Sequence, residues 1–518
     1  MAAHRDHFFE NNPHLARSTR TNVAELFRER VRNDGERLAV VDGARRHTFA
    51  ELNRRVNRAA NALTGMGLVP GDRFAVLSSN RAEYIELELA AAKLGVILCA
   101  VNWRLAEPEL AHCLNLVAPR VLIHEPRYAS EPAGLTCRIE HRVDLETDYE
   151  TRLAAASDRE PSYEADPEDG LVIIYTSGTT GLPKGALISH RAMVARASIF
   201  RMEMGLARDD GFIAWAPFYH MASTDQALAT LLMGAPVYIV DGYQGAQIID
   251  IVERQRIGWL VMIPGMIEQF LAEVRARPQG LTPKGVRYVG AMADLVPPHQ
   301  LVELTQLLHA PYVNTFGSTE TGLPPATGAT IAVGEVPTDL AKRISGLCRV
   351  KLVDADDNEV PVGVPGEMAV RGPTLFSGYW NAREVNERDF RGGWFHMGDV
   401  FVRREDGRVA FVDRAKYMIK SGGENIYPAE IERVLLANPL VLEAAVVRRP
   451  DARWGEVPVA FVARSDTSLD ADTLRAACRA QLAGYKQPKA ICFVPFEKFP
   501  RSTAGKVQRH LMEDWPVE

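Results

Sequence analysis

Residues 175–185 read YTSGTTGLPKG, and they follow an apolar run at residues 171–174 that is typical of a buried strand. The stretch holds three glycines, four Thr or Ser hydroxyls, one proline and Lys184. Glycines let backbone N–H groups approach a ligand, hydroxyls add hydrogen-bond donors, and a lysine adds positive charge. These residue types predict a phosphate-binding loop. The spacing after Gly178 and Gly181 does not match a Walker loop, so the stretch alone does not indicate a P-loop NTPase.

Length and composition set the class of protein. The chain has 518 residues, too many for one compact core, so we expect two or more domains. Hydrophobic residues make up 47% of the chain and charged residues 24%, as in ordinary globular proteins. A net charge of −6 and the lack of a basic run argue against binding to nucleic acid or to an anionic membrane surface.

Cysteine usage and the chain ends bear on location. The six cysteines include no CxxC pair, which favours a reduced protein without disulfides or a zinc site. The first residues lack the apolar core of a signal peptide, and no stretch is apolar for long enough to span a bilayer. The ending WPVE is not a lipidation or peroxisomal signal. The sequence therefore predicts a cytoplasmic protein.

The order of the elements predicts the fold class. Strand-like runs alternate with helical patterns from residue 21 to about residue 345, which predicts an α/β fold with largely parallel sheets. We expect the polar segment from about 125 to 165 to lie on the surface. From residue 346 the short runs VKLVDADDNEV, GEMAVRG and GRVAFVD predict a smaller antiparallel subdomain. The last hundred or so residues are long enough for a separate domain, with residues 413–416 as the linker.

Further short motifs follow the opening stretch in a fixed order. They are PFYH (217–220), VGAMA (289–293), FGSTE (316–320), GE…GY (366–379), WFHMGD (394–399), DRAK (413–416), SGGENI (421–426) and TAGK (503–506). In this order and spacing the chain resembles the adenylate-forming superfamily of acyl-CoA synthetases, luciferases and peptide-synthetase adenylation domains. The resemblance implies a large N-terminal domain (1–413) of two α/β subdomains plus a distorted β-barrel. It also implies a small, mobile α+β C-terminal domain (414–518).

The resemblance implies a reaction and its cosubstrates. A carboxylate attacks the α-phosphate of ATP, giving an acyl-adenylate and pyrophosphate, and CoA then displaces AMP to form a thioester. Mg²⁺ accompanies the ATP. No covalent enzyme intermediate is needed, so the protein mainly positions groups and neutralises developing charge.

The resemblance also assigns the residues around the phosphates. The β- and γ-phosphates fall to Thr176, Ser177, Gly178, Thr179, Thr180 and Lys184. Glu320 is the expected Mg²⁺ ligand, because a hard cation bridging phosphates needs a carboxylate oxygen. Its neighbour Thr319 is expected at the α-phosphate. Thr176, Glu320, His220 and Lys506 are the expected catalytic residues.

Adenine and ribose contacts are implied next. One wall of the adenine site falls to Gly290, Ala291, Met292 and Ala293, and the other to Phe316, Gly317 and Ser318. Phe316 stands where the family commonly has Tyr, so the ring for stacking is kept and a phenolic hydrogen bond is lost; taken alone, it is also a candidate core aromatic. Asp399 is expected to accept both ribose hydroxyls, and Arg414 to contact ribose or phosphate.

The C-terminal residues are implied to serve both half-reactions. Lys506, after TAG, is expected to bridge the substrate carboxylate and the α-phosphate. Lys416 matches the hinge about which the small domain rotates, after which Gly422 and Gly423 would leave room for the pantetheine arm. Trp454 and Lys489, with Tyr485 and Lys486, are candidates for the CoA nucleotide. They are equally well explained as core aromatics and solvated lysines.

The acid is expected near PFYH. His220 is placed at the entrance to the acyl pocket, and the expected substrate contacts are Trp215, His220, Met221, Gly317 and Gly322. Residues 215–235 contain no Lys or Arg for a second carboxylate, and PFYHMAS contains no carboxylate for an α-ammonium, although Asp225 is near. This favours a neutral, hydrophobic monocarboxylic acid: aromatic, alicyclic or aliphatic.

Three alternatives stay open. A stand-alone adenylation enzyme would load the phosphopantetheine of a carrier protein, and a luciferase-like oxidase would share the first half-reaction. A nucleotide-binding regulator on this fold would be expected to lack Lys506 or Glu320, and both are present. A homodimer is the expected assembly.

Overall fold

A computed structural model describes residues 18–176, 182–263, 265–294, 296–421, 424–501 and 507–517. The chain forms two compact units, which we describe separately. The first unit holds the chain up to Gln244, together with Ser318–Gly322 and Pro373–Asn386. The second holds Gly245–Gly317, Leu323–Gly372 and the chain from Glu387 onward. The fold is mixed α/β, as the sequence predicts.

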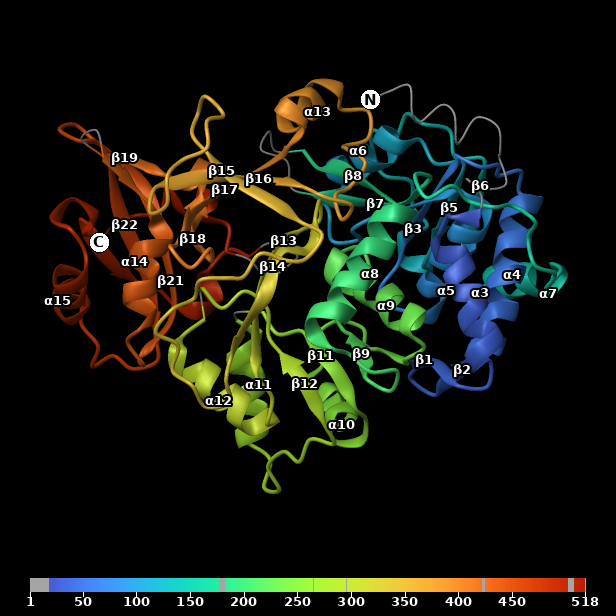
Figure 1. Ribbon diagram of the computed structural model, residues 1–518, viewed down its shortest axis with the longest axis horizontal. Coiled ribbons are helices and arrows are strands. Elements are labelled where there is room, and N and C mark those ends of the chain that lie inside the picture. The colour runs from blue at the N-terminus through green and yellow to red at the C-terminus, as the bar shows by residue number, and fades with distance from the viewer. Residues whose placement is uncertain are drawn as a thin grey trace. The chain divides into compact units, whose positions relative to one another are not determined.

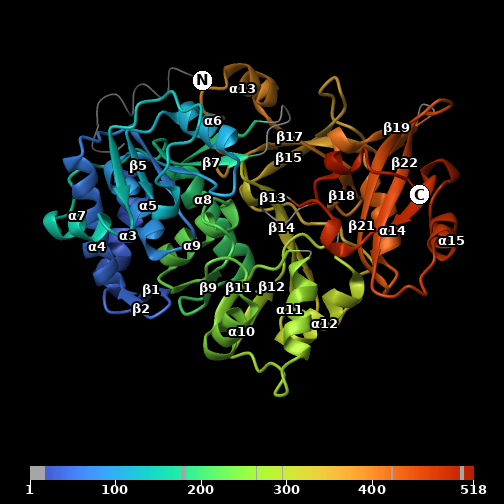
Figure 2. The same cartoon turned by 180° about the vertical axis from the view of Figure 1, so that it is seen from behind.

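The first unit is built on two sheets. One has six strands in the order β6-β5-β3-β4-β7-β8, parallel except for the last pair, and the other runs β9-β10-β1-β2. Figures 1 and 2 show helices α3, α4 and α5 grouped beside β3 and β5. The strands are β1 (Leu38–Asp42), β2 (Arg45–Thr48), β3 (Arg73–Leu77), β4 (Ile97–Ala100), β5 (Val121–His124), β6 (His141–Asp144), β7 (Gly170–Thr176), β8 (Lys184–Ser189), β9 (Gly211–Ala214) and β10 (Val237–Ile239).

The helices of the first unit begin where local sequence signals place them. Thr48 and Glu51 form a reciprocal capping box at the start of α4, and Gly95 ends α5 in the left-handed conformation. The helices are α3 (Val23–Asp34), α4 (Phe49–Gly65), α5 (Ala82–Leu94), α6 (Glu107–Val117), α7 (Tyr149–Ala155), α8 (His190–Met204) and α9 (Met221–Met233).

The segment from 125 to 165 contains more structure than the sequence predicts. It includes the edge strand β6 and the short helix α7. Helix α7 buries only Tyr149 and Leu153, so the apolar periodicity that reveals a helix is almost absent.

The second unit contains three sheets. Parallel strands β11 (Ile257–Leu260), β12 (Val286–Val289) and β13 (Tyr312–Ser318) adjoin β14 (Gly322–Ile331), with helices α10 (Gly245–Arg254), α11 (Met266–Arg275) and α12 (Pro298–Leu308). The predicted antiparallel subdomain is confirmed as a four-stranded sheet, β15 (Arg349–Val353), β16 (Pro365–Arg371), β17 (Phe395–Arg403) and β18 (Val409–Arg414). Its closure into a distorted barrel stays a prediction. Helix α13 spans Arg383–Asp389.

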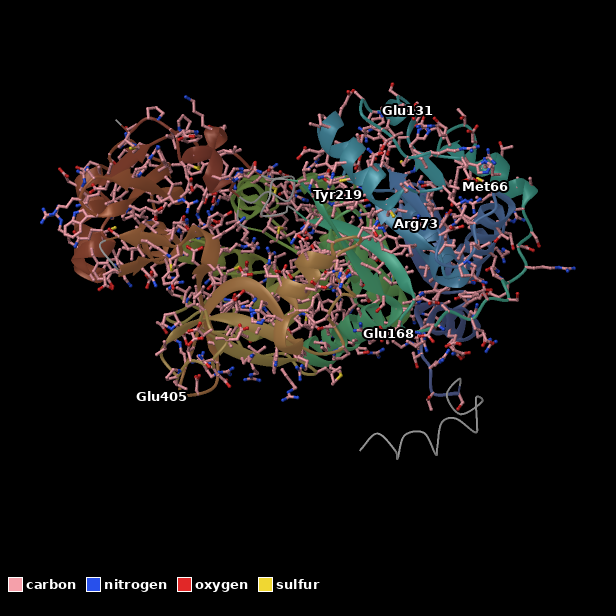
Figure 3. All side chains as sticks on the ribbon, turned by 90° about the horizontal axis from the view of Figure 1, so that it is seen from above. Met66, Arg73, Glu131, Glu168, Tyr219 and Glu405 are labelled. Atoms are coloured by element: carbon pink, nitrogen blue, oxygen red, sulfur yellow. The ribbon has the colours of Figure 1, made fainter. Side chains whose placement is uncertain are left out.

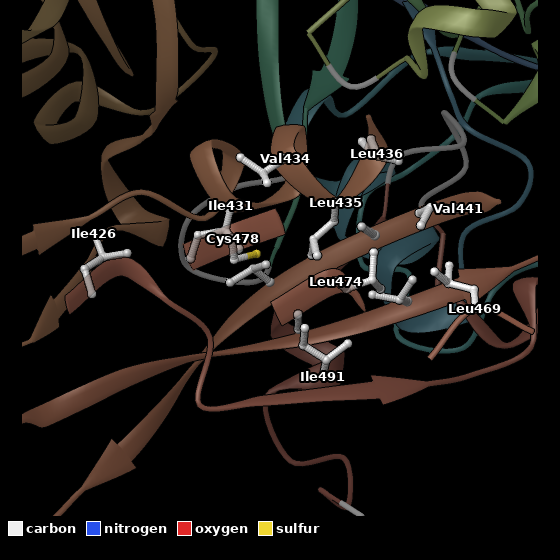
Figure 4. Packing of buried hydrophobic residues seen from close by; sticks show 14 of the residues in the cluster. Ile426, Ile431, Val434, Leu435, Leu436, Val441, Leu469, Leu474, Cys478 and Ile491 are labelled. Atoms are coloured by element: carbon white, nitrogen blue, oxygen red, sulfur yellow. The ribbon is translucent and has the colours of Figure 1, made fainter. Parts of the chain in front are cut away.

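The last hundred residues form the α+β layer that the sequence predicts. Helices α14 (Pro428–Leu436) and α15 (Ala471–Gln481) accompany β19 (Ile419–Ser421), β20 (Glu424–Ile426), β21 (Val441–Asp451), β22 (Gly455–Arg464) and β23 (Ala490–Phe493). Figure 4 shows their shared core, in which Ile431 and Leu435 of α14 lie with Leu474 and Cys478 of α15 and Ile491 of β23. This layer therefore has a hydrophobic core of its own.

Candidate active site

The phosphate-binding stretch connects the two strands of a hairpin. Strands β7 and β8 are antiparallel, with Thr176 directly opposite Lys184 and Tyr175 opposite Gly185. The two predicted phosphate ligands, Thr176 and Lys184, therefore stand side by side where the strands end. Ser177, Gly178, Thr179 and Thr180 lie outside the described residues.

Glu320 lies within the first unit, close to this hairpin. Its Oε1 accepts a hydrogen bond from the phenol of Tyr379 at 2.7 Å, and its backbone carbonyl accepts one from Phe376 N at 2.8 Å. The Nζ of Lys184 lies 3.8 Å from the centroid of the same tyrosine ring. One side chain thus touches both the predicted metal ligand and the predicted phosphate ligand.

The chemistry of Glu320 fits a magnesium ion. Within the described residues its carboxylate makes no ion pair, and no group of three or more His, Cys, Asp or Glu gathers as a protein-only metal site. Mg²⁺ is commonly bound by one or two carboxylates plus substrate phosphates and waters, so a single carboxylate beside a phosphate loop is a suitable donor set.

Arg196 of α8 anchors the turn that carries Glu320, and sequence reasoning missed it. Its side chain is 3% exposed. It donates to the carbonyls of Thr319 at 3.1 Å and Thr374 at 2.9 Å, and to Asp225 Oδ2 at 2.9 Å. Gly322, at φ +76°, packs so tightly that an added Cβ would come within 2.7 Å of Arg196 Cδ. Gly322 is therefore needed for close packing on this arginine.

Asp225 belongs to a buried acidic pair on the other side of Arg196. Burial raises the pKa of Asp225, and Arg196 opposes that rise. Burial, together with the negative charge of Asp225, raises the pKa of Glu88 well above its usual range. Asp225 is 3% exposed, and the Oδ2 of its carboxylate is already paired with the Arg196 guanidinium.

His220 ends the PFYH turn and caps helix α9. Its Nδ1 accepts a hydrogen bond from Ala222 N at 3.2 Å. Because Nδ1 is the acceptor, the neutral ring carries its proton on Nε2, which can donate to a carboxylate. Buried Asn80 holds the turn, accepting from Phe218 N at 2.9 Å and donating to Ala216 O at 2.8 Å. Sequence reasoning missed Asn80.

The side chains around His220 are apolar and largely buried. Trp215 is 6% exposed and stands edge-on to Tyr243, with ring centroids 5.8 Å apart. Met221 is 8% exposed, and Tyr219, labelled in Figure 3, is 7% exposed. These neighbours of His220 in the chain are thus apolar or aromatic and buried, and an acyl pocket lined by Trp215 and Met221 stays a prediction.

In the second unit, the predicted adenine wall follows β12. Gly290 has φ +96°, and an added Cβ would lie 2.2 Å from the ring of Tyr312, so only glycine fits. Trp259 Nε1 donates to Gly290 O at 2.7 Å, and Ala293 N donates to Asn314 Oδ1 at 3.0 Å. Ala291 and Met292 lie in the turn between these two bonds.

A buried ion pair follows the predicted adenine wall at residues 290–293. Lys342 Nζ binds Asp294 Oδ2, and the two side chains are 0% and 1% exposed. Lys342 also donates to Leu340 O at 3.3 Å, and Asn314 Nδ2 donates to the same carbonyl at 2.9 Å. These contacts fix the backbone that follows Gly290.

Phe316 sits at the centre of an aromatic cluster. Its ring centroid lies 4.7 Å from that of Phe401 and 5.7 Å from that of Phe411, and its side chain is 7% exposed. The structure thus places Phe316 as a packing residue, and its stacking on adenine stays a prediction. Gly317 and Ser318 end β13, and Thr319 begins the following turn.

Asp399 and Arg414 are neighbours across two strands. They are register partners on β17 and β18, with Arg414 Nε 3.3 Å from Asp399 Oδ1. Asp399 is 3% exposed. A buried carboxylate held by arginine is suited to accept two ribose hydroxyls.

The hinge candidate Lys416 is exposed and lies between anchored neighbours. Asp413 accepts from Arg414 N at 2.7 Å and from Ala429 N at 2.9 Å, while Arg509 lies 4.9 Å from the centroid of the Tyr417 ring. Lys506, Gly422 and Gly423 lie outside the described residues.

The CoA candidates lie at the surface of the last layer. Trp454 is 39% exposed in the turn between β21 and β22, so it is not a core aromatic. Lys489 joins the sheet through its backbone, donating to Pro458 O at 2.8 Å, and Lys486 pairs with Glu430 at 2.9 Å. Their contact with CoA stays a prediction.

None of the helices in the described part of the chain has the length and apolar character that crossing a lipid bilayer requires.

Comparison with known proteins identifies the family. Residues 27–380 match the AMP-binding enzyme family, and residues 430–506 match the AMP-binding enzyme C-terminal domain. A feruloyl-CoA synthase from Amycolatopsis sp is 35% identical over 92% of this chain and 96% of its own. A fatty acid–[acyl-carrier-protein] ligase, ScoC of Streptomyces coeruleorubidus, is 32% identical over 92% of this chain and 93% of its own.

A solved structure agrees with this assignment. The o-succinylbenzoate CoA synthetase of Bacillus subtilis, in complex with its acyl-adenylate intermediate, superposes with a TM-score of 0.82. It is 25% identical and covers 96% of this chain and 99% of its own. The chain therefore belongs to the AMP-binding, adenylate-forming enzymes, and within them it is an AMP-forming acid–thiol ligase.

Proposed function

We propose that this enzyme is an acyl-CoA synthetase for a neutral, hydrophobic monocarboxylic acid that carries an aromatic ring. The observation that carries the proposal is the cluster of Lys184, Tyr379 and Glu320 beside the β7–β8 hairpin, in a chain that matches the family in both of its domains. A carboxylate is a poor electrophile, and adenylation converts it into one with AMP as the leaving group.

Residues of the first unit hold the phosphate end of ATP. Lys184 and Thr176, side by side on the hairpin, bind the β- and γ-phosphates together with residues 177–180. Glu320 would hold the Mg²⁺, which supplies charge neutralisation to those phosphates when bound. Thr319, fixed through its carbonyl by Arg196, lies beside it for the α-phosphate.

A second group of residues holds the nucleoside. Gly290, Ala291 and Met292 supply a narrow backbone surface for adenine, together with Phe316, Gly317 and Ser318. Asp399 accepts from the ribose hydroxyls, and Arg414 keeps its carboxylate oriented.

The acid is oriented by His220. Its Nε2–H donates to the substrate carboxylate, because Nδ1 is engaged by Ala222 N. We assign Trp215, Met221, Gly317 and Gly322 to contacts with the acid. An aromatic acid is favoured because a relative named above is a feruloyl-CoA synthase. An α-amino acid is disfavoured because Asp225, the nearby carboxylate for its ammonium, is paired with Arg196.

The small domain, residues 414–518, alternates between the two half-reactions. Lys506 bridges the carboxylate and α-phosphate in the first. Rotation at Lys416 then withdraws it and brings Gly422 and Gly423 toward the thiol path, with Trp454 and Lys489 at the CoA nucleotide. We also propose a cytoplasmic location and a homodimer.

Product release tests the reaction and its acceptor. Pyrophosphate should appear with a given acid alone, and AMP should appear only when CoA is added. A panel of aromatic, alicyclic and aliphatic acids then ranks the substrates. The ScoC likeness makes a carrier-protein acceptor the second candidate. Turnover with a phosphopantetheinylated carrier protein but not with free CoA would overturn the CoA assignment.

One variant tests the division of labour between the half-reactions. Lys506→Ala should lower acid-dependent pyrophosphate release by about 100-fold or more, because it removes a charge placed where two anions meet. It should leave thioester formation from supplied acyl-adenylate largely unchanged. Lys498→Ala, at an exposed tail lysine, is the matched control. Equal loss of both steps would contradict domain alternation.

A further inference from the structure

Residues 373–386, which we call the return segment, follow a stretch of the second unit in the chain but belong to the first unit. There they lie against β8. Ser377 N donates to Leu187 O at 2.7 Å, Leu187 N donates to Gly378 O at 3.0 Å, and Trp380 N donates to Gly185 O at 2.7 Å. Tyr379 forms an isolated antiparallel bridge with Ala186. The backbone of Tyr379 is therefore fixed beside the strand that begins with Lys184.

A second set of bonds fixes Tyr379 from the far side. Tyr379 N donates to Asn386 Oδ1 at 2.7 Å, and Asn386 Nδ2 donates to Tyr379 O at 2.8 Å. The ring of Phe376 stands edge-on to the tyrosine ring, with centroids 4.8 Å apart. With 6% of Tyr379 exposed, its ring and hydroxyl have little freedom to move.

The two ends of the Tyr379 side chain meet groups of opposite charge. Its hydroxyl donates to Glu320 Oε1 at 2.7 Å, a charge-assisted bond, and its ring lies 3.8 Å from Lys184 Nζ, where the π face attracts an ammonium. Among the described residues no ion pair joins Lys184 directly to Glu320. One side chain, that of Tyr379, thus contacts both groups.

We propose that Tyr379 is a positioning residue that holds Glu320 and Lys184 at a fixed separation, ready for the metal and the phosphates of ATP. The proposal rests on the function proposed above, which makes Glu320 the metal ligand and Lys184 a phosphate ligand. The hydroxyl orients the carboxylate, as partners of metal ligands commonly do, and the ring orients the ammonium. These two roles belong to different atoms, so substitutions can separate them.

Tyr379→Phe removes only the bond to Glu320. It should weaken Mn²⁺ binding to the complex with a non-hydrolysable ATP analogue by about 10-fold, as loss of an orienting partner does. ATP binding in EDTA, measured by calorimetry, should stay unchanged because the ring is kept. Tyr379→Leu removes both contacts and should also weaken metal-free ATP binding, by roughly two- to five-fold. Mn²⁺ binding is followed by electron paramagnetic resonance.

Tyr163→Phe is the matched control. Tyr163 donates to Asp169 Oδ2 at 2.8 Å in the same unit, so the variant loses a bond of the same kind at the end of the β7–β8 pair opposite to Lys184. It should leave Mn²⁺ and ATP affinity unchanged. Thermal melting of all variants shows that they are folded.

Glu320→Gln separates the failure of this proposal from failure of the proposed function. If Glu320→Gln binds Mn²⁺ as tightly as the unaltered enzyme, the metal assignment and the proposal both fall. If Glu320→Gln loses Mn²⁺ but Tyr379→Phe binds it normally or more tightly, only the proposal falls. Metal-free ATP affinity that is equal in Tyr379→Leu and Tyr379→Phe overturns the role of the ring.

Discussion

Each unit of the molecule places a buried ion pair next to a segment assigned to ATP, but the two pairs are built differently. In the first unit Arg196 reaches Asp225 and two backbone carbonyls in three directions. In the second, Lys342 reaches Asp294 and the carbonyl of Leu340, which also accepts from Asn314. The guanidinium of Arg196 joins separate segments of the chain. The ammonium of Lys342 instead binds a carbonyl, that of Leu340, which already has Asn314 as a donor.

The difference follows from the donors that each side chain carries. A guanidinium has five N–H donors in a planar fork, and an ammonium is a compact point charge. Arg196 holds Thr319 of the Glu320 turn and Thr374 of the return segment at once, so its loss removes one donor from each of these two carbonyls. Loss of Lys342 leaves chiefly Asp294. We call the Arg196–Asp225 pair the junction, because it connects separate segments. We call the Lys342–Asp294 pair the brace, because it reinforces one local stretch of backbone.

The largest expected effect comes from Arg196→Met. It leaves Asp225 buried and uncompensated, so we expect the free energy of unfolding to fall by about 5 kcal/mol, the upper end for a broken buried pair. Because Thr319 also loses its donor, adenylation should be impaired in the fraction that stays folded. Urea unfolding measures the first effect and pyrophosphate release the second. An Arg196→Lys variant that behaves like the unaltered protein would contradict the need for a fork.

A pair of double variants tests the comparison directly. Lys342→Met/Asp294→Leu replaces a buried pair by apolar groups and should come within about 1 kcal/mol of the unaltered stability, as such replacements often do. Arg196→Met/Asp225→Leu should stay destabilised by roughly 2–4 kcal/mol, because the carbonyls of Thr319 and Thr374 still lack this donor. Urea unfolding of the two double variants, beside their single variants, makes the measurement. Equal recovery of both would abolish the distinction between junction and brace.

The sequence predicted the secondary structure that local patterns determine and the site residues that lie in the family motifs. The alternation of strands and helices and the antiparallel run after residue 346 came from short-range patterns that the structure confirms. The structure also brings Thr176 and Lys184 together, and Asp399 and Arg414. Family motifs named those residues, and the pairing of strands places them in register.

The residues that hold the site in place could not be predicted from local sequence patterns. Arg196 and Thr374 are 178 positions apart, and Lys342 and Asp294 are 48 apart, so no local pattern links them. Within HRAMVARASIF an arginine looks like an exposed position of a helix. Tyr379 stood inside a quoted motif, yet its contacts with Glu320 and Lys184 depend on how the return segment packs against β8.

The smallest expected effect concerns His190, which begins α8, the helix that carries Arg196. Its Nδ1 accepts from Val23 N at 3.3 Å, and burial lowers its pKa to about 4. The folded state therefore binds fewer protons than the unfolded state between pH 4 and the ordinary value of 6.5. Its contribution to stability is complete above pH 6.5 and is lost as the pH falls through this window, by about 2 kcal/mol at pH 5.

His190→Asn keeps an acceptor for Val23 N and removes the titrating ring. Comparing the two proteins at pH 7.5 gives the fixed cost of the substitution, and the further change down to pH 5 isolates the titration. Urea unfolding at both values should show that the variant loses about 2 kcal/mol less stability on acidification. An equal loss in both proteins would mean that His190 is protonated in the fold. The junction at Arg196 would then lie on a helix whose first residue carries a positive charge.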